Sequence, residues 1–246
     1  MSQTGYNLTK RNMKKAWLVF VTVLLFTGSP LLAQVDVYVN LGAAIPVGKF
    51  AGGEGVNEIA LTNADYKEGG AGLGAIVGTK VKFNFGPKGF GVFLSLDGIY
   101  NGLNTDVRDD IEDLETYYEQ EYGWADRART PKYINVPLMV GAHYVYNINS
   151  SIGIYGGAAC GANFRRITRL YVPYVEEYRY YRNKFSFAFQ VGAGVEIVRR
   201  ITVGADFYYL GTERVIGYES SIAYDGSFYG KRITPTLIMF RVGYKF

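Results

Sequence analysis

The sequence predicts an all-β fold in which eight antiparallel strands close into an up-and-down barrel. Three observations lead to this prediction. Eight segments alternate apolar with polar residues, the connections between them alternate between short and long, and the last segment ends on an aromatic residue. A period of two places the two sets of side chains on opposite faces of a strand. The chain has 246 residues, including 31 glycines and 22 tyrosines, but its single cysteine excludes an internal disulfide framework.

Residues 1–33 have the form of an N-terminal extension followed by a cleaved signal peptide. Two lysines precede the apolar segment Ala16–Phe26, and Ala33 offers a small residue at the expected cleavage point. The apolar segment has eleven residues, whereas a membrane-spanning helix needs about 20. We therefore assign residues 34–246 to a single barrel domain.

Removing the predicted signal peptide changes the charge balance. The whole chain has 26 basic and 22 acidic residues, a formal net charge of +4. Residues 1–33 hold four basic residues and no acidic one, so residues 34–246 carry 22 of each sign. A domain with no net charge offers no general attraction for a nucleic acid, and we expect no nucleic-acid partner.

The eight alternating segments are long enough to cross a bilayer as tilted strands, which takes about 9–11 residues each. Lys184–Val198 is the clearest, because Phe187 and Val191 alternate with Gln190 and Glu196. The segments are Val35–Pro46, Gly70–Phe85, Phe90–Leu103, Lys132–Tyr146, Ser151–Arg165, Lys184–Val198, Ile201–Thr212 and 231–246.

The connections between these segments alternate strictly in length. Residues 86–89, 147–150 and 199–200 form short turns of four, four and two residues. The long connections have 23, 28, 18 and 18 residues, and they are 47–69, 104–131, 166–183 and 213–230. Outer-membrane barrels have short periplasmic turns and long outer loops. A soluble barrel would place its apolar face inside, whereas here glycine and charge occupy the second face. The prediction is therefore an eight-stranded antiparallel up-and-down transmembrane β-barrel in the outer membrane of a Gram-negative bacterium, with both termini in the periplasm.

The last strand carries an expected assembly signal. From Ile238 to Phe246, every second residue is large and apolar or aromatic, and the chain ends on Phe246. This ending resembles the closing strand of outer-membrane barrels, whose terminal aromatic residue is recognised by the barrel-assembly machinery. The resemblance gives this role to Tyr244 and Phe246.

Aromatic residues near the strand ends predict girdles at the two membrane interfaces. These residues are Tyr100, Tyr133, Tyr144, Tyr146, Phe164, Tyr171, Tyr208 and Tyr209. Pro137 lies inside a predicted strand although it has no backbone donor, so we expect an irregular strand ladder at this position.

Three stretches resemble a small outer-membrane β-barrel family that includes PorT-like proteins. They are Tyr133–Val140 (YINVPLMV), Gly153–Ala158 (GIYGGA) and Val191–Glu196 (VGAGVE). The resemblance extends over nearly all of residues 34–246. It implies a non-enzymatic structural or interaction role in the cell envelope, with a place as a subunit of an envelope or secretion complex.

The polar face of the predicted barrel holds four acidic and four basic residues. An eight-stranded barrel is just wide enough for its own side chains to fill. We therefore expect an internal salt-bridge network that plugs the lumen. The alternative is a gated, narrow porin-like ion path through the same residues. The lumen charge network consists of Asp36, Lys80, Lys82, Asp97, Glu196, Asp206, Arg241 and Lys245.

Catalytic and metal-binding signatures are absent from the sequence. The chain has one histidine, His143, with no nucleophile–histidine–acid spacing around it, so an outer-membrane lipid hydrolase is the weakest alternative. No cysteine or histidine cluster predicts a metal site, and we expect no cofactor. Cys160 lies among small residues and is interpreted as a packing residue.

Two of the long loops carry opposite charge. Loop 104–131 is acidic, and its segment Asp109–Gln120 could form a short helix, whereas loop 166–183 is rich in arginine and tyrosine. The loops could dock on each other. The arginines could instead contact lipopolysaccharide phosphates, and the tyrosines an envelope protein partner. We expect outer-membrane lipid and lipopolysaccharide, the barrel-assembly machinery and an envelope protein as partners.

Overall fold

The computed structural model describes residues 34–51, 70–85, 89–123, 127–168, 170–172, 177–180, 184–221 and 224–246. The predicted signal peptide, residues 1–33, lies outside the described residues, as do 86–88 of the first short turn and most of connection 47–69.

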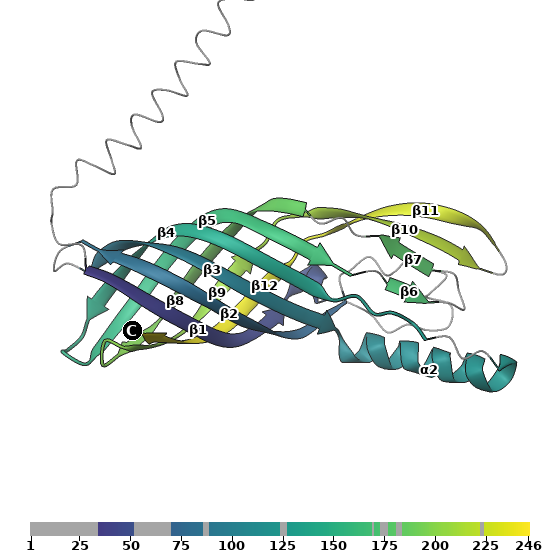
Figure 1. Cartoon of the computed structure of the whole chain (residues 1–246), viewed down its shortest axis with the longest axis horizontal. Helices are drawn as coiled ribbons and strands as arrows, with labels where there is room; N and C mark the ends of the chain where they lie inside the picture. The colour runs from purple at the N-terminus through teal and green to yellow at the C-terminus, as the bar shows by residue number, and fades with distance from the viewer. Residues whose placement is uncertain are drawn as a thin grey trace, which may run out of the picture.

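Eight strands form a closed antiparallel barrel, which confirms the predicted fold (Figure 1). Each strand pairs with its sequence neighbour in the barrel, and the last strand pairs with the first along nine residues, from Tyr38↔Lys245 to Pro46↔Leu237. The strands in barrel order are β1 (Gln34–Pro46), β2 (Ala71–Asn84), β3 (Phe90–Leu103), β4 (Tyr133–Asn147), β5 (Ile152–Ile167), β8 (Lys184–Ile197), β9 (Ile201–Tyr209) and β12 (Thr236–Lys245).

The two ends of the barrel differ. The short connections and the C-terminus lie at one end, which we call the turn end (Figure 1). The long connections leave from the opposite end, which we call the loop end. The turn between β8 and β9 closes with a hydrogen bond from the Arg200 N–H to the Ile197 carbonyl at 3.1 Å.

Two of the long connections were wrongly predicted as loops without strands. They contain β6 (Leu170–Val172), β7 (Glu177–Tyr180), β10 (Glu213–Ser221) and β11 (Tyr224–Ile233), which form a second sheet in the order β11-β10-β7-β6. This sheet extends beyond the loop end (Figure 1). The prediction failed because it considered only strands long enough to cross a bilayer. These segments are rich in tyrosine, isoleucine and valine, which favour strands outside the membrane as well.

The acidic connection contains α2 (Thr105–Tyr122), a longer helix than the predicted Asp109–Gln120. The Asn104 side chain accepts a hydrogen bond from the Asp106 N–H at 3.3 Å, which caps the first turn. Gly123 ends the helix in the left-handed conformation, with φ of 68°. Val107 and Ile111, one turn apart, are buried and hold one face of the helix against the protein.

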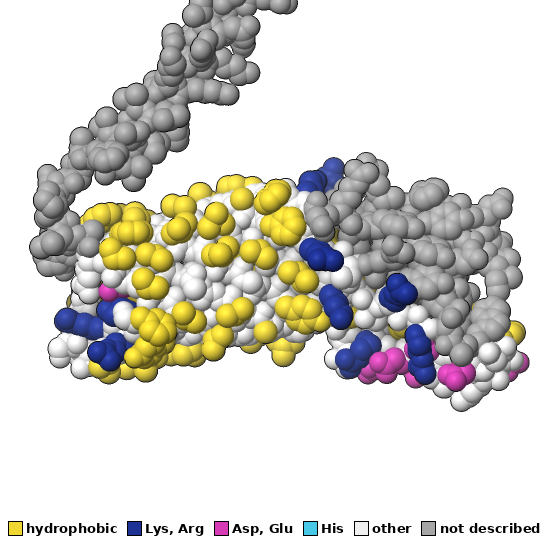
Figure 2. Space-filling view, in the orientation of Figure 1, with side chains coloured by type: hydrophobic (Ala, Val, Ile, Leu, Met, Phe, Trp, Pro, Cys, Tyr) yellow, Lys and Arg dark blue, Asp and Glu magenta, His cyan; other side chains and the backbone are white. Residues whose placement is uncertain are grey.

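The outer face of the barrel is apolar. Leu73, Val140 and Phe187 are 71%, 60% and 64% exposed to solvent in the isolated chain. Such residues cover the barrel as a band, and basic side chains lie at both of its ends (Figure 2). A contiguous apolar band of this extent requires a lipid environment. Cys160, which we interpreted as a packing residue, is exposed on this face.

The predicted aromatic girdle is correct only in part. Tyr100, Tyr144 and Tyr146 lie exposed on the outer face. Tyr133 and Tyr208 are instead turned inward and are 2% and 0% exposed. Both tyrosines belong to the inward-facing set of residues in their strands. The prediction was wrong because it relied on their position near the strand ends and not on this alternation.

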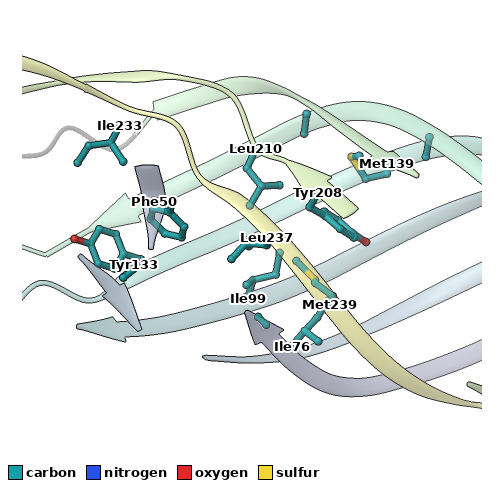
Figure 3. Packing of buried hydrophobic residues seen from close by; sticks show 14 of the residues in the cluster. Phe50, Ile76, Ile99, Tyr133, Met139, Tyr208, Leu210, Ile233, Leu237 and Met239 are labelled. Carbon is teal, nitrogen blue, oxygen red and sulfur yellow. The ribbon is translucent and has the colours of Figure 1, made fainter. Parts of the chain in front are cut away.

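The interior of the loop half is filled by apolar side chains, which we call the apolar layer (Figure 3). All of its members are at most 3% exposed. Inward residues of β12 change from apolar to charged along the strand, from Leu237 and Met239 to Arg241 and Lys245. The apolar layer consists of Ile76, Ile99, Met139, Leu210, Leu237 and Met239.

Pro137 interrupts the ladder without a bulge. The β3–β4 pairs Leu96↔Leu138 and Ile99↔Asn135 share one register, but the two positions between them are unpaired. On its other side, Pro137 keeps its register opposite Asn163. The missing donor of proline thus produces a local gap in the β3–β4 pairing.

Candidate functional site

Arg241 lies at the centre of a buried charge cluster between β3, β9 and β12. Its Nη2 is 2.5 Å from Asp206 Oδ2 and its Nη1 is 3.6 Å from Asp97 Oδ1. The Tyr208 hydroxyl donates to Asp97 Oδ2 at 2.8 Å and accepts from Arg241 Nη1 at 3.2 Å. We call these four residues the arginine cluster. Charges this deeply buried are stable only when they are paired and hydrogen-bonded to one another.

A second group of charges lies nearer the turn end. Lys245 Nζ is 3.3 Å from Asp36 Oδ1, and Lys82 Nζ is 3.9 Å from Glu196 Oε2. Asn84 donates a further hydrogen bond to Asp36 Oδ2 at 2.8 Å. Seven of the eight residues that we expected to form a single network therefore divide between two levels of the lumen.

Lys80 belongs to neither group. Its side chain is buried, and its Nζ lies 4.7 Å from the centre of the Phe93 ring. Among the described residues, no carboxylate lies within ion-pair distance of Lys80. A cation over an aromatic face gains part of the stabilisation that a carboxylate would supply.

Glycines on neighbouring strands make room for the lumen carboxylates. A Cβ at Gly78 would lie 2.0 Å from Asp97 Oδ1, and a Cβ at Gly192 would lie 2.0 Å from Asp206 Oδ1. Both distances are far below van der Waals contact. At these two positions, glycine leaves the space that the acidic side chain of the neighbouring strand occupies.

A buried polar hub near the loop end was missed by the sequence analysis. Arg165 is 1% exposed and donates to the carbonyls of Leu210 and Gly211 at 2.5 and 3.0 Å, and to Asn135 Oδ1 at 3.1 Å. Asn163 donates to Asn135 Oδ1 at 2.9 Å. The signal was available, because Arg165 and Asn163 both alternate with the outward Phe164. The hub ties β5 to the bend from which β10 leaves the barrel.

The His143 side chain contacts an asparagine and a phenylalanine inside the barrel. Its Nε2 lies 3.0 Å from Asn84 Oδ1, and its ring packs beside Phe93 with ring centres 6.1 Å apart. No hydrogen bond joins it to a serine, threonine or cysteine among the described residues. Within the same residues, no group of three potential metal ligands occurs, and no helix is long and apolar enough to cross a membrane.

The interior spaces beside the arginine cluster are small. Two spaces of about 10 Å³ each adjoin Lys80 and Lys82. A space of this size holds about one water molecule. Toward the loop end, Leu210, Leu237 and Met239 of the apolar layer are 0% exposed, so water does not reach them.

The turn end opens into a larger polar pocket of about 360 Å³, which we call the mouth pocket. Tyr38 and Lys82 line its inner part, and Arg199 and Lys245 come from the strand ends at its rim. No member of the arginine cluster lines this pocket, and the apolar layer closes the lumen beyond that cluster, so the pocket is a blind recess.

The chain belongs to the outer membrane protein beta-barrel domain family, whose sequence profile matches residues 32–211. No curated protein matches the sequence. Among solved structures, OprG of Pseudomonas aeruginosa is 12% identical, with 87% of this chain and 97% of that one covered and a TM-score of 0.45. Ail of Yersinia pestis, solved with the heparin analogue sucrose octasulfate, is 14% identical, with 87% and 99% covered and a TM-score of 0.42. Neisserial surface protein A is 12% identical, with 86% and 97% covered and a TM-score of 0.41.

Family membership confirms the outer-membrane location expected from the sequence. The role in an envelope or secretion complex, which the PorT-like resemblance implies, stays an expectation. At the C-terminus, the rings of Tyr244 and Phe246 meet edge to face at 5.2 Å, and the Phe246 N–H donates to the Val37 carbonyl at 3.1 Å. Both side chains are exposed at the turn end, and their role as an assembly signal stays a prediction.

Proposed function

We propose that this protein is a closed, non-enzymatic outer-membrane barrel that acts through helix α2 and the second sheet, which lie beyond the loop end. The observation that carries the proposal is the filled lumen. The arginine cluster and the apolar layer follow each other along the barrel, and both are nearly inaccessible to water.

A narrow porin-like channel fits the lumen poorly. An ion on a path between the two ends would have to displace Leu237 and Met239 and break the 2.5 Å contact between Arg241 and Asp206. An ion also loses its hydration in an apolar passage, at a cost of several kcal/mol. A lipid hydrolase is disfavoured because His143 is bonded to an amide and not to a nucleophile.

The structure beyond the loop end offers a surface for a protein partner of the envelope. The acidic helix α2 is fixed by Glu115, which accepts from Arg127 Nη1 at 3.3 Å and from the Ala128 N–H. Glu112 and Asp113 lie exposed on the same helix. A helix that exposes carboxylates suits recognition of a basic partner surface. The PorT-like resemblance supports a partner within an envelope or secretion complex.

The ends of the apolar band support contact with lipid headgroups. Lys132, Arg166, Lys184 and Arg232 are exposed where the barrel meets the second sheet. Basic side chains at this level suit the phosphates of lipopolysaccharide. In the proposed orientation the loop end faces outside the cell and both termini face the periplasm.

Conductance and phospholipase assays test whether the barrel is closed and non-enzymatic. The purified protein in planar lipid bilayers should give no stepwise ion conductance. A conductance that changes with Asp97→Asn or Arg241→Met would establish the channel instead, and a phospholipase activity lost in His143→Ala would establish the hydrolase.

Site-specific photo-cross-linking tests the presented surface. A cross-linker at Glu112 of α2 should capture one reproducible envelope protein in intact cells, whereas a cross-linker at Ile154 on the lipid face should capture lipid. Equal capture at both positions would contradict a partner surface on α2.

A further inference from the structure

The mouth pocket has no part in the proposed function, yet its side chains form a defined recess. The pocket measures about 360 Å³ and opens at the turn end. This volume lies in the lower range of small-molecule sites, which extend from about 300 to 1,000 Å³. The side chains that decide its chemistry are Asp36, Lys82, Asn147, Glu196, Arg199 and Lys245.

The pocket carries one more cation than it has carboxylates. Lys82, Arg199 and Lys245 oppose Asp36 and Glu196. Lys245 is paired with Asp36 at 3.3 Å, and among the described residues Lys82 has one carboxylate within ion-pair distance, that of Glu196, at the long distance of 3.9 Å. One positive charge therefore stays uncompensated, and it is that of Arg199.

Arg199 lines the rim of the pocket and makes no ion pair with any described residue. It lies in a strained turn, since Val198 and Arg199 have φ of 52° and 55°. This left-handed region is unfavourable for residues other than glycine, asparagine and aspartate, and least favourable for a β-branched residue. Two successive left-handed residues, closed by the hydrogen bond from the Arg200 N–H to the Ile197 carbonyl, form the type I′ turn of a tight β-hairpin. The turn holds an unpaired guanidinium at the mouth of the pocket.

Lys82 provides a second and independent indication of a ligand. The residue is 4% exposed, and its Nζ has no hydrogen-bond partner among the described residues. The ammonium lies 4.4 Å from the centre of the Tyr38 ring and 5.0 Å from that of Tyr155. A buried ammonium group without a hydrogen-bond acceptor is rare in proteins, because its desolvation is costly.

The charge balance selects the class of ligand. A monoanion would balance the charges of these side chains, whereas a dianion would meet stronger repulsion from Asp36 and Glu196. A guanidinium favours the planar carboxylate group, which it can bind through two parallel hydrogen bonds. The Asn147 amide on the wall suits hydroxyl groups.

We propose that the mouth pocket binds a small hydroxylated monocarboxylate, such as a sugar acid, with its carboxylate between Arg199 and Lys82. The pocket is blind, so the site is a binding site and not the entrance of a transport path. It is independent of the partner surface on α2, and either proposal stands if the other fails.

The test uses the folded protein in detergent, with gluconate as the probe and uncharged sorbitol as its control, by titration calorimetry. Gluconate should bind saturably at one site, and sorbitol should not. Arg199→Gly and Lys82→Met should each weaken gluconate binding at least tenfold. Arg200→Gly, in the same turn but outside the pocket lining, should leave it unchanged.

A stability readout separates a role in binding from a role in folding. Glycine relieves the left-handed strain at position 199, so Arg199→Gly should resist urea as well as or better than the unchanged protein while losing gluconate. Absence of saturable gluconate binding, equal binding of sorbitol, or full binding by Arg199→Gly would each overturn the proposal.

Discussion

The substitution Arg241→Met tests whether the arginine cluster holds the barrel together. Methionine keeps much of the side-chain volume but removes the guanidinium that lies 2.5 Å from Asp206 and 3.6 Å from Asp97. Both carboxylates stay in a region where Arg241 itself is only 5% exposed. Asp97 retains the Tyr208 hydroxyl, and Asp206 retains Gln190, whose Nε2 donates at 2.6 Å.

The expected loss follows from the burial of these charges. Removing one member of a buried ion pair costs about 3–5 kcal/mol, because the remaining charge is left without compensation. Arg241→Met should therefore lower the free energy of unfolding by about 3–5 kcal/mol. Adding Asp206→Asn to this variant removes the carboxylate that lost its nearest partner, and should recover at least about 1 kcal/mol.

The assay is urea unfolding in lipid vesicles, with folded and unfolded protein separated by gel electrophoresis without heating. Arg200→Met, an exposed arginine at the turn end, is the matched control and should change stability by less than about 0.5 kcal/mol. A loss below about 1 kcal/mol for Arg241→Met, or no recovery in the double variant, would refute the reasoning. Either result would mean that the lumen carboxylates are hydrated in the folded barrel.

Three further predictions concern the lipid face, the lumen packing and the terminal strand. Val191 faces outward at the middle of β8, so Val191→Arg should lower the free energy of unfolding in vesicles by about 2–4 kcal/mol. Ile197→Arg, at the end of the strand, should lower it by only about 0–1 kcal/mol, and equal losses would contradict the assigned lipid face. Gly192→Ala should lower the free energy of unfolding by about 1–3 kcal/mol, because the new Cβ would lie 2.0 Å from the Asp206 Oδ1 of the arginine cluster. A Cβ at Gly102 meets nothing within 4 Å, so Gly102→Ala should leave the stability unchanged. Similar urea midpoints for the two variants would refute the close packing. Phe246→Ala should reduce the folded protein in the outer membrane, as measured by quantitative immunoblotting, and an unchanged level would show that the terminal aromatic residue is not needed.

Local alternation accounts for what the sequence predicted well. Each residue of a strand faces in or out according to its parity, so Val191 and Asp206 were assigned to opposite faces without knowledge of any partner. The error at Tyr208 came from setting this rule aside for a residue near a strand end. The same parity was sufficient to place Arg165 in the lumen.

The strands beyond the membrane could not be predicted from the length of a bilayer crossing. β10 and β11 extend the barrel hairpin in water, and their pairing Glu213↔Ile233 begins where the barrel strands end. Sequence alternation and β-propensity continue through this boundary, so neither marks it. The bend at Leu210 and Gly211 depends on Arg165 from a strand 45 residues away.

By itself, the sequence determined the number of barrel strands, the lipid-facing side, the glycine-rich polar interior and the position of the charges within it. Only the tertiary structure decided which charges meet. Arg241 joins Asp97 and Asp206, whereas Lys82 lies beside Glu196 at another level. The physical reason is that parity is a property of one strand, whereas contacts across a lumen depend on the tilt and stagger of all eight strands together.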